Sequence, residues 1–337
     1  MDKSEINGRD LVKNSLLIND EDIVISKSPF SAFENIESEE LVYKGSTTYM
    51  NAEHITLQVH MGYLKVKDDD TIDLEILKAL DELEFAISRM ITIYLNLKGI
   101  DIHQKKVQKR LSYLNRLRII SSYELKSTDK DGNIKKSPTP IYFLDKASVF
   151  ILKSQGIKTN YRLETALKSK NGIKEILSRN QLMLKYTSTI KNINFTKNNP
   201  TYKLQNGNEY QPHLQIVFDN KGKNQYILFE FIRSYDGWQD KLINKLDKCK
   251  YVIESFTPSK TIPSVPLVIL VAEDDKHALD IMKLIIKNDL TIKNSPYLFT
   301  TDNRTLTSPL NQSIFRFGVE DNKPVIKTLS IELFNIV

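Results

Sequence analysis

The chain has 337 residues, of which 40% are hydrophobic and 27% are charged, and its formal net charge is +6. This length exceeds that of most single hydrophobic cores, so it predicts two domains and a short tail. The longest apolar runs, such as Val265–Ala272, are far shorter than the roughly 18 residues that cross a bilayer, which argues against a membrane protein.

The amino-terminal residues and the cysteine content both favour a cytoplasmic protein. The segment Met1–Glu5 lacks the apolar core of a secretory signal peptide. Cys249 is the sole cysteine, so it cannot take part in an internal disulfide. We therefore expect a reduced, cytoplasmic chain.

The first 70 residues have little periodicity. Residues 1–53 are polar, with an acidic stretch at Glu34–Glu40, and we interpret them as a loosely ordered or accessory arm. The alternation over His54–Val66 predicts a hairpin, and the acidic run Asp68–Asp70 marks a boundary. A first helix follows, because Leu74, Leu77 and Leu80 repeat at helical spacing.

Caps and breakers divide the next segment into helices. Thr71 or Asp73 is placed to cap the first helix. A second helix is predicted over Phe85–Leu97 and is ended by Gly99, which supplies a left-handed residue. A third helix is predicted over Ile102–Arg118, after Asp101 as its cap.

The third helix has an apolar stripe and an opposed basic stripe. Between Ile100 and Lys136 there are ten Lys or Arg against four Asp or Glu, and this excess of six equals that of the whole chain. Because the charge is concentrated, we interpret the basic stripe as a DNA-binding face in which cations neutralise phosphates and Arg or Gln reads base edges. The helix residues assigned to it are Lys105, Lys106, Gln108, Lys109, Arg110, Ser112, Tyr113, Arg116 and Arg118. The alternative is a solvated basic helix face.

Two strands, Ile119–Lys126 and Pro140–Leu144, are predicted after this helix, joined by the turn signal at Asp129–Asn133. Three helices followed by a basic hairpin are typical of a winged helix-turn-helix, here assigned to residues 54–157, whose last helix enters the major groove. The hairpin residues expected to pass near phosphates are Lys126, Lys130, Lys135 and Lys136.

The carboxy-terminal region, residues 165–337, predicts an α/β domain with a mixed sheet, which makes the chain α/β (α+β overall). Helices and strands alternate after an initial helix and hairpin. The expected helices are Lys170–Tyr186, Gly237–Glu254 and Lys276–Lys287, and the expected strands are Gln211–Phe218, Gln225–Ile232, Pro266–Ala272 and Pro296–Thr301. The inner side of the middle helix is assigned to Trp238, Leu242, Leu246 and Cys249.

Two adjacent predicted strands carry Pro212–His213 and then Glu230, followed by Ile232. A proline-acid step and then Glu-x-Lys is the layout of the PD-(D/E)XK nuclease fold, in which carboxylates hold a divalent metal. Here His213 replaces the acid and Ile232 replaces the lysine, so the site is interpreted as degenerate.

Neighbouring groups offer replacements for the missing nuclease residues. If the site is active, the catalytic candidates are Glu175, His213, Glu230 and Lys241, with Asp219 as a further carboxylate and Mg²⁺ or Mn²⁺ as cofactor. The preferred interpretation is that Glu230 simply pairs with Arg233 or Lys241. No zinc-type Cys/His spacing and no phosphate-binding glycine loop occurs, so no other cofactor or metal is predicted.

The order of these motifs resembles the replication-relaxation family of plasmid and mobile-element proteins. The resemblance covers about Asp70–Thr301 and is carried by Leu74–Leu77, Val107–Leu111, Leu114-x-x-Leu117, Pro212–His213 and Glu230. It implies a winged helix joined to a nuclease-like domain, acting in replication or conjugative transfer by binding near an origin and recruiting a relaxase or replication initiator. The departures at His213 and Ile232 affect catalysis and leave DNA binding untouched.

Three hypotheses follow. The first is a sequence-preferring, non-enzymatic binder of double-stranded DNA, and the second is a metal-dependent nuclease. The third is a transcription regulator or interaction scaffold whose carboxy-terminal domain captures a partner or forms a homodimer.

Overall fold

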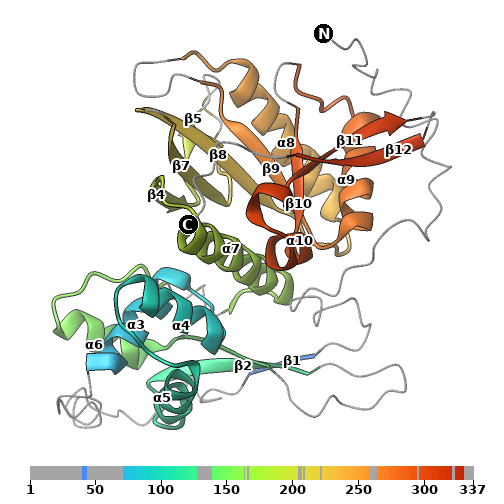
Figure 1. Cartoon of the computed structure of the whole chain (residues 1–337). Coiled ribbons are helices and arrows are strands. Elements are labelled where there is room, and N and C mark those ends of the chain that lie inside the picture. The colour runs from blue at the N-terminus through green and yellow to red at the C-terminus, as the bar shows by residue number, and fades with distance from the viewer. Residues whose placement is uncertain are drawn as a thin grey trace. The chain divides into compact units, whose positions relative to one another are not determined.

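The computed structural model describes residues 40–43, 71–126, 139–162, 164, 167–203, 207, 209–220, 222–258, 264–293, 296–320 and 323–329 (Figure 1). The chain divides into two compact units. The described residues up to 184 form one, here called the winged-helix unit, and the described residues from 185 onward form the other, called the sheet unit. The fold is α/β, as the sequence predicted.

Three helices and a hairpin build the winged-helix unit, in the predicted order. The helices are α3 (Thr71–Leu83), α4 (Ser88–Leu97) and α5 (Gln104–Arg116). The hairpin strands are β2 (Ile120–Lys126) and β3 (Thr139–Leu144), which pair antiparallel. Helix α5 leads directly into the antiparallel pair, so the predicted order of three helices and two strands is present among the described residues.

The turn between α4 and α5 is set by Gly99, as predicted. Gly99 has a φ of +81°, and the Ile100 N–H donates to the Leu95 carbonyl oxygen at 3.0 Å, which closes the end of α4. The helix cap at the other side of the turn was predicted wrongly. The residue before α5 is His103, whose side chain makes no capping bond, and Asp101 lies outside this position.

Helix α4 begins later than predicted because its expected first turn is extended backbone. Ala86 pairs with Tyr142 of β3 through two reciprocal hydrogen bonds of 3.0 and 2.9 Å. This short bridge ties the segment between α3 and α4 to the wing sheet. Local helical spacing could not reveal it, because the partner strand lies more than 50 residues later in the sequence.

Strand β1 (Glu40–Tyr43) completes a three-stranded sheet in the order β1-β2-β3. It pairs antiparallel with β2, and Tyr43 lies opposite Tyr123. The sequence had assigned these residues to a loosely ordered arm, and the pairing corrects that assignment for residues 40–43. The predicted turn at Asp129–Asn133 and the predicted hairpin at His54–Val66 lie outside the described residues.

Two more helices belong wholly or partly to the winged-helix unit. Helix α6 (Lys146–Ser154) begins with a capping box formed by Asp145 and Ser148. Helix α7 (Lys170–Thr189) belongs to this unit as far as residue 184. Its Asn180 side chain donates to the carbonyl oxygens of Leu83 and Phe85, which fixes the loop after α3.

The sheet unit contains a seven-stranded mixed sheet in the order β12-β11-β10-β9-β8-β7-β4. Strands β8, β9 and β10 run parallel, and the remaining neighbours are antiparallel. The strands are β4 (Ile193–Asn198), β7 (Leu214–Asn220), β8 (Lys223–Phe231), β9 (Leu267–Ala272), β10 (Leu298–Thr301), β11 (Phe315–Glu320) and β12 (Lys323–Thr328). The predicted β7–β8 hairpin is confirmed.

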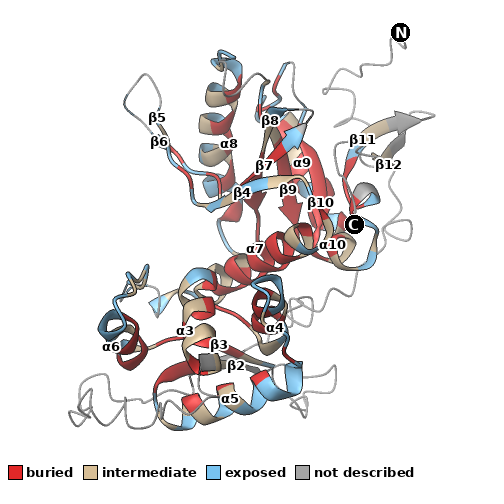
Figure 2. Cartoon of the chain, turned by 60° about the vertical axis from the view of Figure 1, so that its left-hand side comes forward, coloured by how far each residue is buried: buried red, intermediate tan, exposed pale blue. Residues whose placement is uncertain are grey.

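Helices α8 (Trp238–Glu254), α9 (Asp275–Lys287) and α10 (Asp302–Thr307) follow strands β8, β9 and β10. The predicted inner side of α8, from Trp238 to Cys249, is buried within a large apolar cluster together with α9 and the central strands (Figure 2). Among the described residues, no helix combines the length and apolar character that crossing a bilayer requires.

His277 lies in this core near the ends of the parallel strands. Its side chain is 7% exposed, and its ring packs edge-on against Trp238 at a centroid distance of 4.9 Å. Burial, together with the nearby Arg233, lowers the pKa of His277 to about 3. Arg233 is itself held by Asp302 at 2.5 and 3.1 Å. The imidazole is therefore neutral in the folded chain.

Acid should destabilise the sheet unit through His277. The unfolded imidazole takes up a proton below its ordinary pKa of 6.5, whereas the folded one does so only near 3. The free energy of unfolding is therefore unaffected well above pH 6.5 and falls as the pH drops from about 6.5 towards 3, with a loss of about 2 kcal/mol by pH 5. Urea unfolding should show that between pH 7 and pH 5 the His277→Gln variant loses about 2 kcal/mol less free energy of unfolding than the wild type. Equal losses in the two proteins would contradict a neutral, buried His277.

Candidate nucleic-acid interface and a buried charged site

Helix α5 separates apolar and basic side chains as its sequence predicted. Val107, Leu111 and Leu114 are fully buried, whereas Lys105 and Lys109 are exposed. The other exposed side chains of the predicted face are Lys106, Gln108, Ser112, Arg116 and Arg118. Figure 2 shows the α5 ribbon with pale-blue exposed residues and red buried residues along its length. The apolar stripe anchors the helix, so the cations are held on a rigid surface.

Arg110 has a different place from the other predicted contacts. Its guanidinium pairs with both carboxylate oxygens of Asp73, a side chain that is fully buried in α3. It also lies over the ring of Tyr113, 4.6 Å from the centroid, and Arg116 lies 5.7 Å from the same ring. The structure thus gives Arg110 a bonding role between α3 and α5, and Asp73 is a partner of Arg110 inside the unit.

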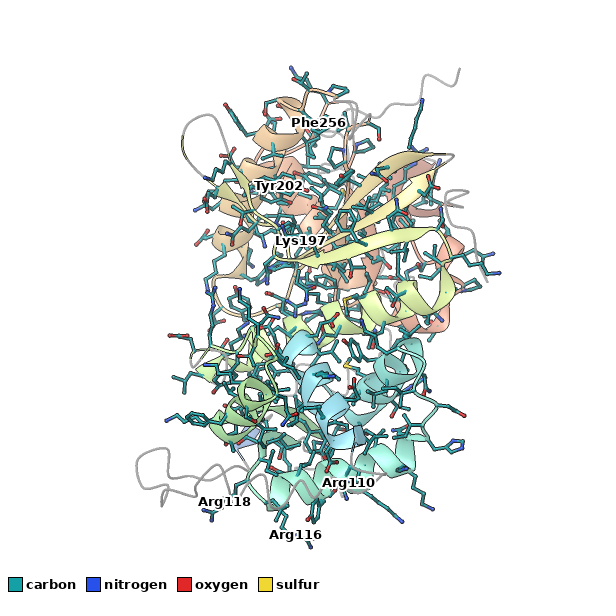
Figure 3. All side chains as sticks on the ribbon, turned by 90° about the vertical axis from the view of Figure 1, so that its left-hand side faces the viewer. Arg110, Arg116, Arg118, Lys197, Tyr202 and Phe256 are labelled. Carbon is teal, nitrogen blue, oxygen red and sulfur yellow. The ribbon has the colours of Figure 1, made fainter. Side chains whose placement is uncertain are left out.

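The amino-terminal half of α5 is oriented by α4. Gln104 and Gln108 both place their side-chain amide within 3.4 Å of the Ser88 hydroxyl. Figure 3 shows Arg116 and Arg118 pointing outward beyond the ribbon. Of the predicted wing contacts, Lys130, Lys135 and Lys136 and the side chain of Lys126 lie outside the described residues.

The sheet unit brings together the two nuclease-pattern residues on neighbouring strands. His213 precedes β7, and Glu230 lies near the end of β8. The His213 Nδ1 atom is 2.8 Å from Glu230 Oε2 and 2.9 Å from the Phe231 backbone N–H. One imidazole tautomer therefore donates to the carboxylate, and the other accepts from the backbone.

Lys245, on α8, completes the cluster. Its ammonium is 2.7 Å from Glu230 Oε2 and 2.8 Å from His213 Nε2. Glu230 is fully buried, whereas the side chains of Lys245 and His213 are 27% and 18% exposed. The buried carboxylate is thus covered by two groups that reach the surface.

The electrostatics of Glu230 reflect this arrangement. Burial raises the pKa of Glu230, but Lys245 and His213 outweigh it and hold the pKa below its ordinary value. The carboxylate in turn acts on its neighbours: burial, then Glu230, raises the pKa of the Tyr210 phenol well above 10. Burial also raises the pKa of the Cys249 thiol to about 12. The cluster therefore contains one ionised carboxylate among neutral phenol and thiol groups.

The predicted partners of Glu230 were wrong. Arg233 pairs with Asp302, and Lys241 lies over the ring of Tyr235, 4.9 Å from its centroid. Lys245 was missed, although it lies one helical turn after Lys241 and so shares its face of α8. The other candidates are also elsewhere. Glu175 belongs to the winged-helix unit, and Asp219 accepts a hydrogen bond from the Gly222 N–H in the β7–β8 turn.

The donor set at Glu230 does not fit a catalytic Mg²⁺ or Mn²⁺ ion. In the described part of the chain, no group of three His, Cys, Asp or Glu residues converges on one point. One carboxylate and one imidazole are fewer oxygen ligands than these ions prefer. Moreover, the Lys245 ammonium already occupies the cation position between them. The geometry therefore favours an internal ion cluster over metal-assisted hydrolysis.

No family model matches the sequence, and no curated protein matches it. The crystal structure of protein VC1899 from Vibrio cholerae is similar at 13% identity and a TM-score of 0.27 over 74% of this chain. The match spans about half of that protein, 53% of its length. A likeness at this level does not establish a shared fold.

Replacing Lys245 should destabilise the protein far more than replacing Lys241. Lys245→Met leaves a fully buried carboxylate with only an imidazole, which costs about 3–5 kcal/mol. Lys241→Met removes an exposed ammonium and should change the free energy of unfolding by no more than about 0.5 kcal/mol. Urea unfolding of both variants provides the measurement. Equal losses would mean that Lys245 is not the group that neutralises Glu230.

Proposed function

We propose that the protein binds double-stranded DNA through the exposed face of α5. The observation that carries this proposal is the division of α5 between a fully buried apolar stripe and an exposed stripe bearing Lys105, Lys109 and Arg116. Exposed cations at i, i+4 and i+11 lie on one side of a helix. Such a face attracts the phosphate backbone and contributes most of the affinity for any sequence.

The winged-helix order supports a definite docking mode. In this class of domain the last helix of the helix-turn-helix lies in the major groove, and here that helix is α5. The β2–β3 hairpin follows it directly and would lie beside the DNA backbone. Arg110, which is paired with Asp73, would keep α5 seated on α3. Gln108 would be the side chain best placed to read a base edge.

The biological setting is inferred from the family resemblance. It points to a plasmid or mobile element in which the protein binds near an origin and recruits a relaxase or replication initiator. Sequencing of DNA fragments selected by the purified protein would test this setting. Enrichment of replication or transfer origins supports it, whereas enrichment of promoters would favour the alternative of a transcription regulator.

Removing the exposed cations of α5 should abolish most DNA affinity. In a gel-shift titration, the triple variant Lys105→Ala, Lys109→Ala and Arg116→Ala should bind duplex DNA at least about 100-fold more weakly, because each lost phosphate contact removes a counterion-release contribution. The slope of log affinity against log salt should fall by about 1 per contact removed.

A matched control separates the α5 face from net charge. Lys153, Lys158 and Arg162 are exposed side chains of the same unit and of the same types. Their triple alanine variant has the same net charge as the α5 variant and should retain wild-type affinity. An equal loss of DNA affinity in the two triple variants, or no loss in either, would refute the proposal that the exposed face of α5 binds DNA.

Replacing Gln108 should change the protein's preference among DNA sequences more than its overall affinity for DNA. Its exposed amide can exchange the 3.4 Å contact with Ser88 for an adenine edge in the major groove, and a good bidentate pair discriminates by about 1–3 kcal/mol. Selection of bound sequences from a random pool should show that Gln108→Ala relaxes the preference at one position. Lys109→Ala should weaken binding to all sequences alike. If the Gln108→Ala variant keeps the wild-type sequence preference, Gln108 does not read a base.

A further inference from the structure

We infer that a hollow beside α8 in the sheet unit binds a phosphate group of a single nucleic-acid strand without a divalent metal ion. The hollow is open to solvent and has a volume of about 520 Å³. It is lined by Glu209, Tyr210, Gln211, Lys241, Asn244, Lys245 and Lys248. This site is separate from the α5 face and does not rest on it.

Cations dominate the wall that α8 contributes. Lys241, Lys245 and Lys248 are spaced at i, i+4 and i+7, so they form one face of the helix, and all three line the hollow. The opposing acid is Glu209 on β6 (Glu209–Tyr210), which lies opposite Lys203 of β5 (Tyr202–Lys203) in the two-stranded pairing. Three lysines against one exposed carboxylate favour an anionic ligand.

The cluster beneath the hollow fixes one of these cations. Glu230 is neutralised by Lys245 and His213, so the buried carboxylate does not repel an incoming anion as a free charge would. An ammonium group has three N–H donors. The Lys245 ammonium lies 2.7 Å from Glu230 Oε2 and 2.8 Å from His213 Nε2, and its side chain, which is 27% exposed, also lines the hollow. The donor is preorganised, because its position is already set by two contacts shorter than 3 Å.

Amide groups beside the lysines make a nucleic-acid strand the favoured source of the phosphate. The side chains of Gln211 and Asn244 are exposed and line the same hollow as the three lysines. Lysines hold the phosphates of a single strand in a positively charged groove, and amide groups can hydrogen-bond to its base edges. Free inorganic phosphate shares the same charge chemistry, so the experiment must distinguish the two.

The experiment uses the full chain with the three α5 substitutions, so that DNA binding by α5 does not mask binding at the hollow. Fluorescence anisotropy with a labelled thymidine oligonucleotide in EDTA measures binding. Lys241→Ala with Lys248→Ala should weaken it by about tenfold or more, because two phosphate contacts are lost. Lys245 is left intact, because its loss would strand the buried Glu230 charge.

The control is Lys223→Ala with Lys287→Ala, two exposed lysines of the same unit outside the hollow. This pair should leave binding unchanged. Equally weakened oligonucleotide binding in both double variants would overturn the inference. So would a failure of the parent α5 triple variant to bind the oligonucleotide in EDTA. An unaffected duplex affinity in the α5 variant would instead refute the α5 face alone.

Competition identifies the source of the phosphate. Unlabelled oligonucleotide should displace the probe at concentrations about 100-fold or more below those of inorganic phosphate, because a strand adds contacts beyond one phosphate. Equal potency of the two competitors would overturn the assignment to a nucleic-acid strand.

Discussion

A buried carboxylate must be neutralised, and this constraint shapes both units of the protein. Asp73 and Glu230 are each fully buried. An unpaired charge in such a place costs several kcal/mol, so each draws a cation from a basic helix. Asp73 takes Arg110 from α5, and Glu230 takes Lys245 from α8. In each unit, therefore, one cation of a basic helix is committed to the interior.

In both units, one inward-facing ion pair helps to hold a lysine-containing helix against the core while the other cations of that helix face solvent. The Arg110–Asp73 pair adds a polar contact between α5 and α3 to the apolar stripe of Val107, Leu111 and Leu114. The Lys245–Glu230 pair does the same for α8 against β8. Because Arg110 and Lys245 each contact a buried carboxylate, most of the charge that either helix presents to solvent comes from neighbouring side chains, such as Lys109 on α5 and Lys241 on α8.

Much of the architecture could be predicted, because it depends on local signals. The opposed stripes of α5, the left-handed Gly99 and the apolar run of β9 each identify an element without any partner. The features that failed depend on distant residues. The Ala86–Tyr142 bridge shortens α4, and β1 is a strand because β2 offers a free edge. No local period encodes either pairing.

The candidate site shows the same division between local and distant information. His213 and Glu230 were expected to meet, because a short turn between β7 and β8 makes their strands neighbours. The choice of Lys245 over Lys241 was not predictable, since both lie on one face of α8. Only the packing of α8 on the sheet decides which of the two reaches Glu230.

Lys245 also changes what the degenerate nuclease pattern means chemically. In a metal site, the carboxylate would hold a removable divalent ion that supplies positive charge toward phosphate. Here the ammonium of Lys245 lies between the carboxylate and the imidazole, at 2.7 and 2.8 Å. Its charge is covalently attached and cannot activate a water molecule as a divalent ion does. The positive charge beside Glu230 is thus part of the protein itself, and the packing of α8 on the sheet determines its position.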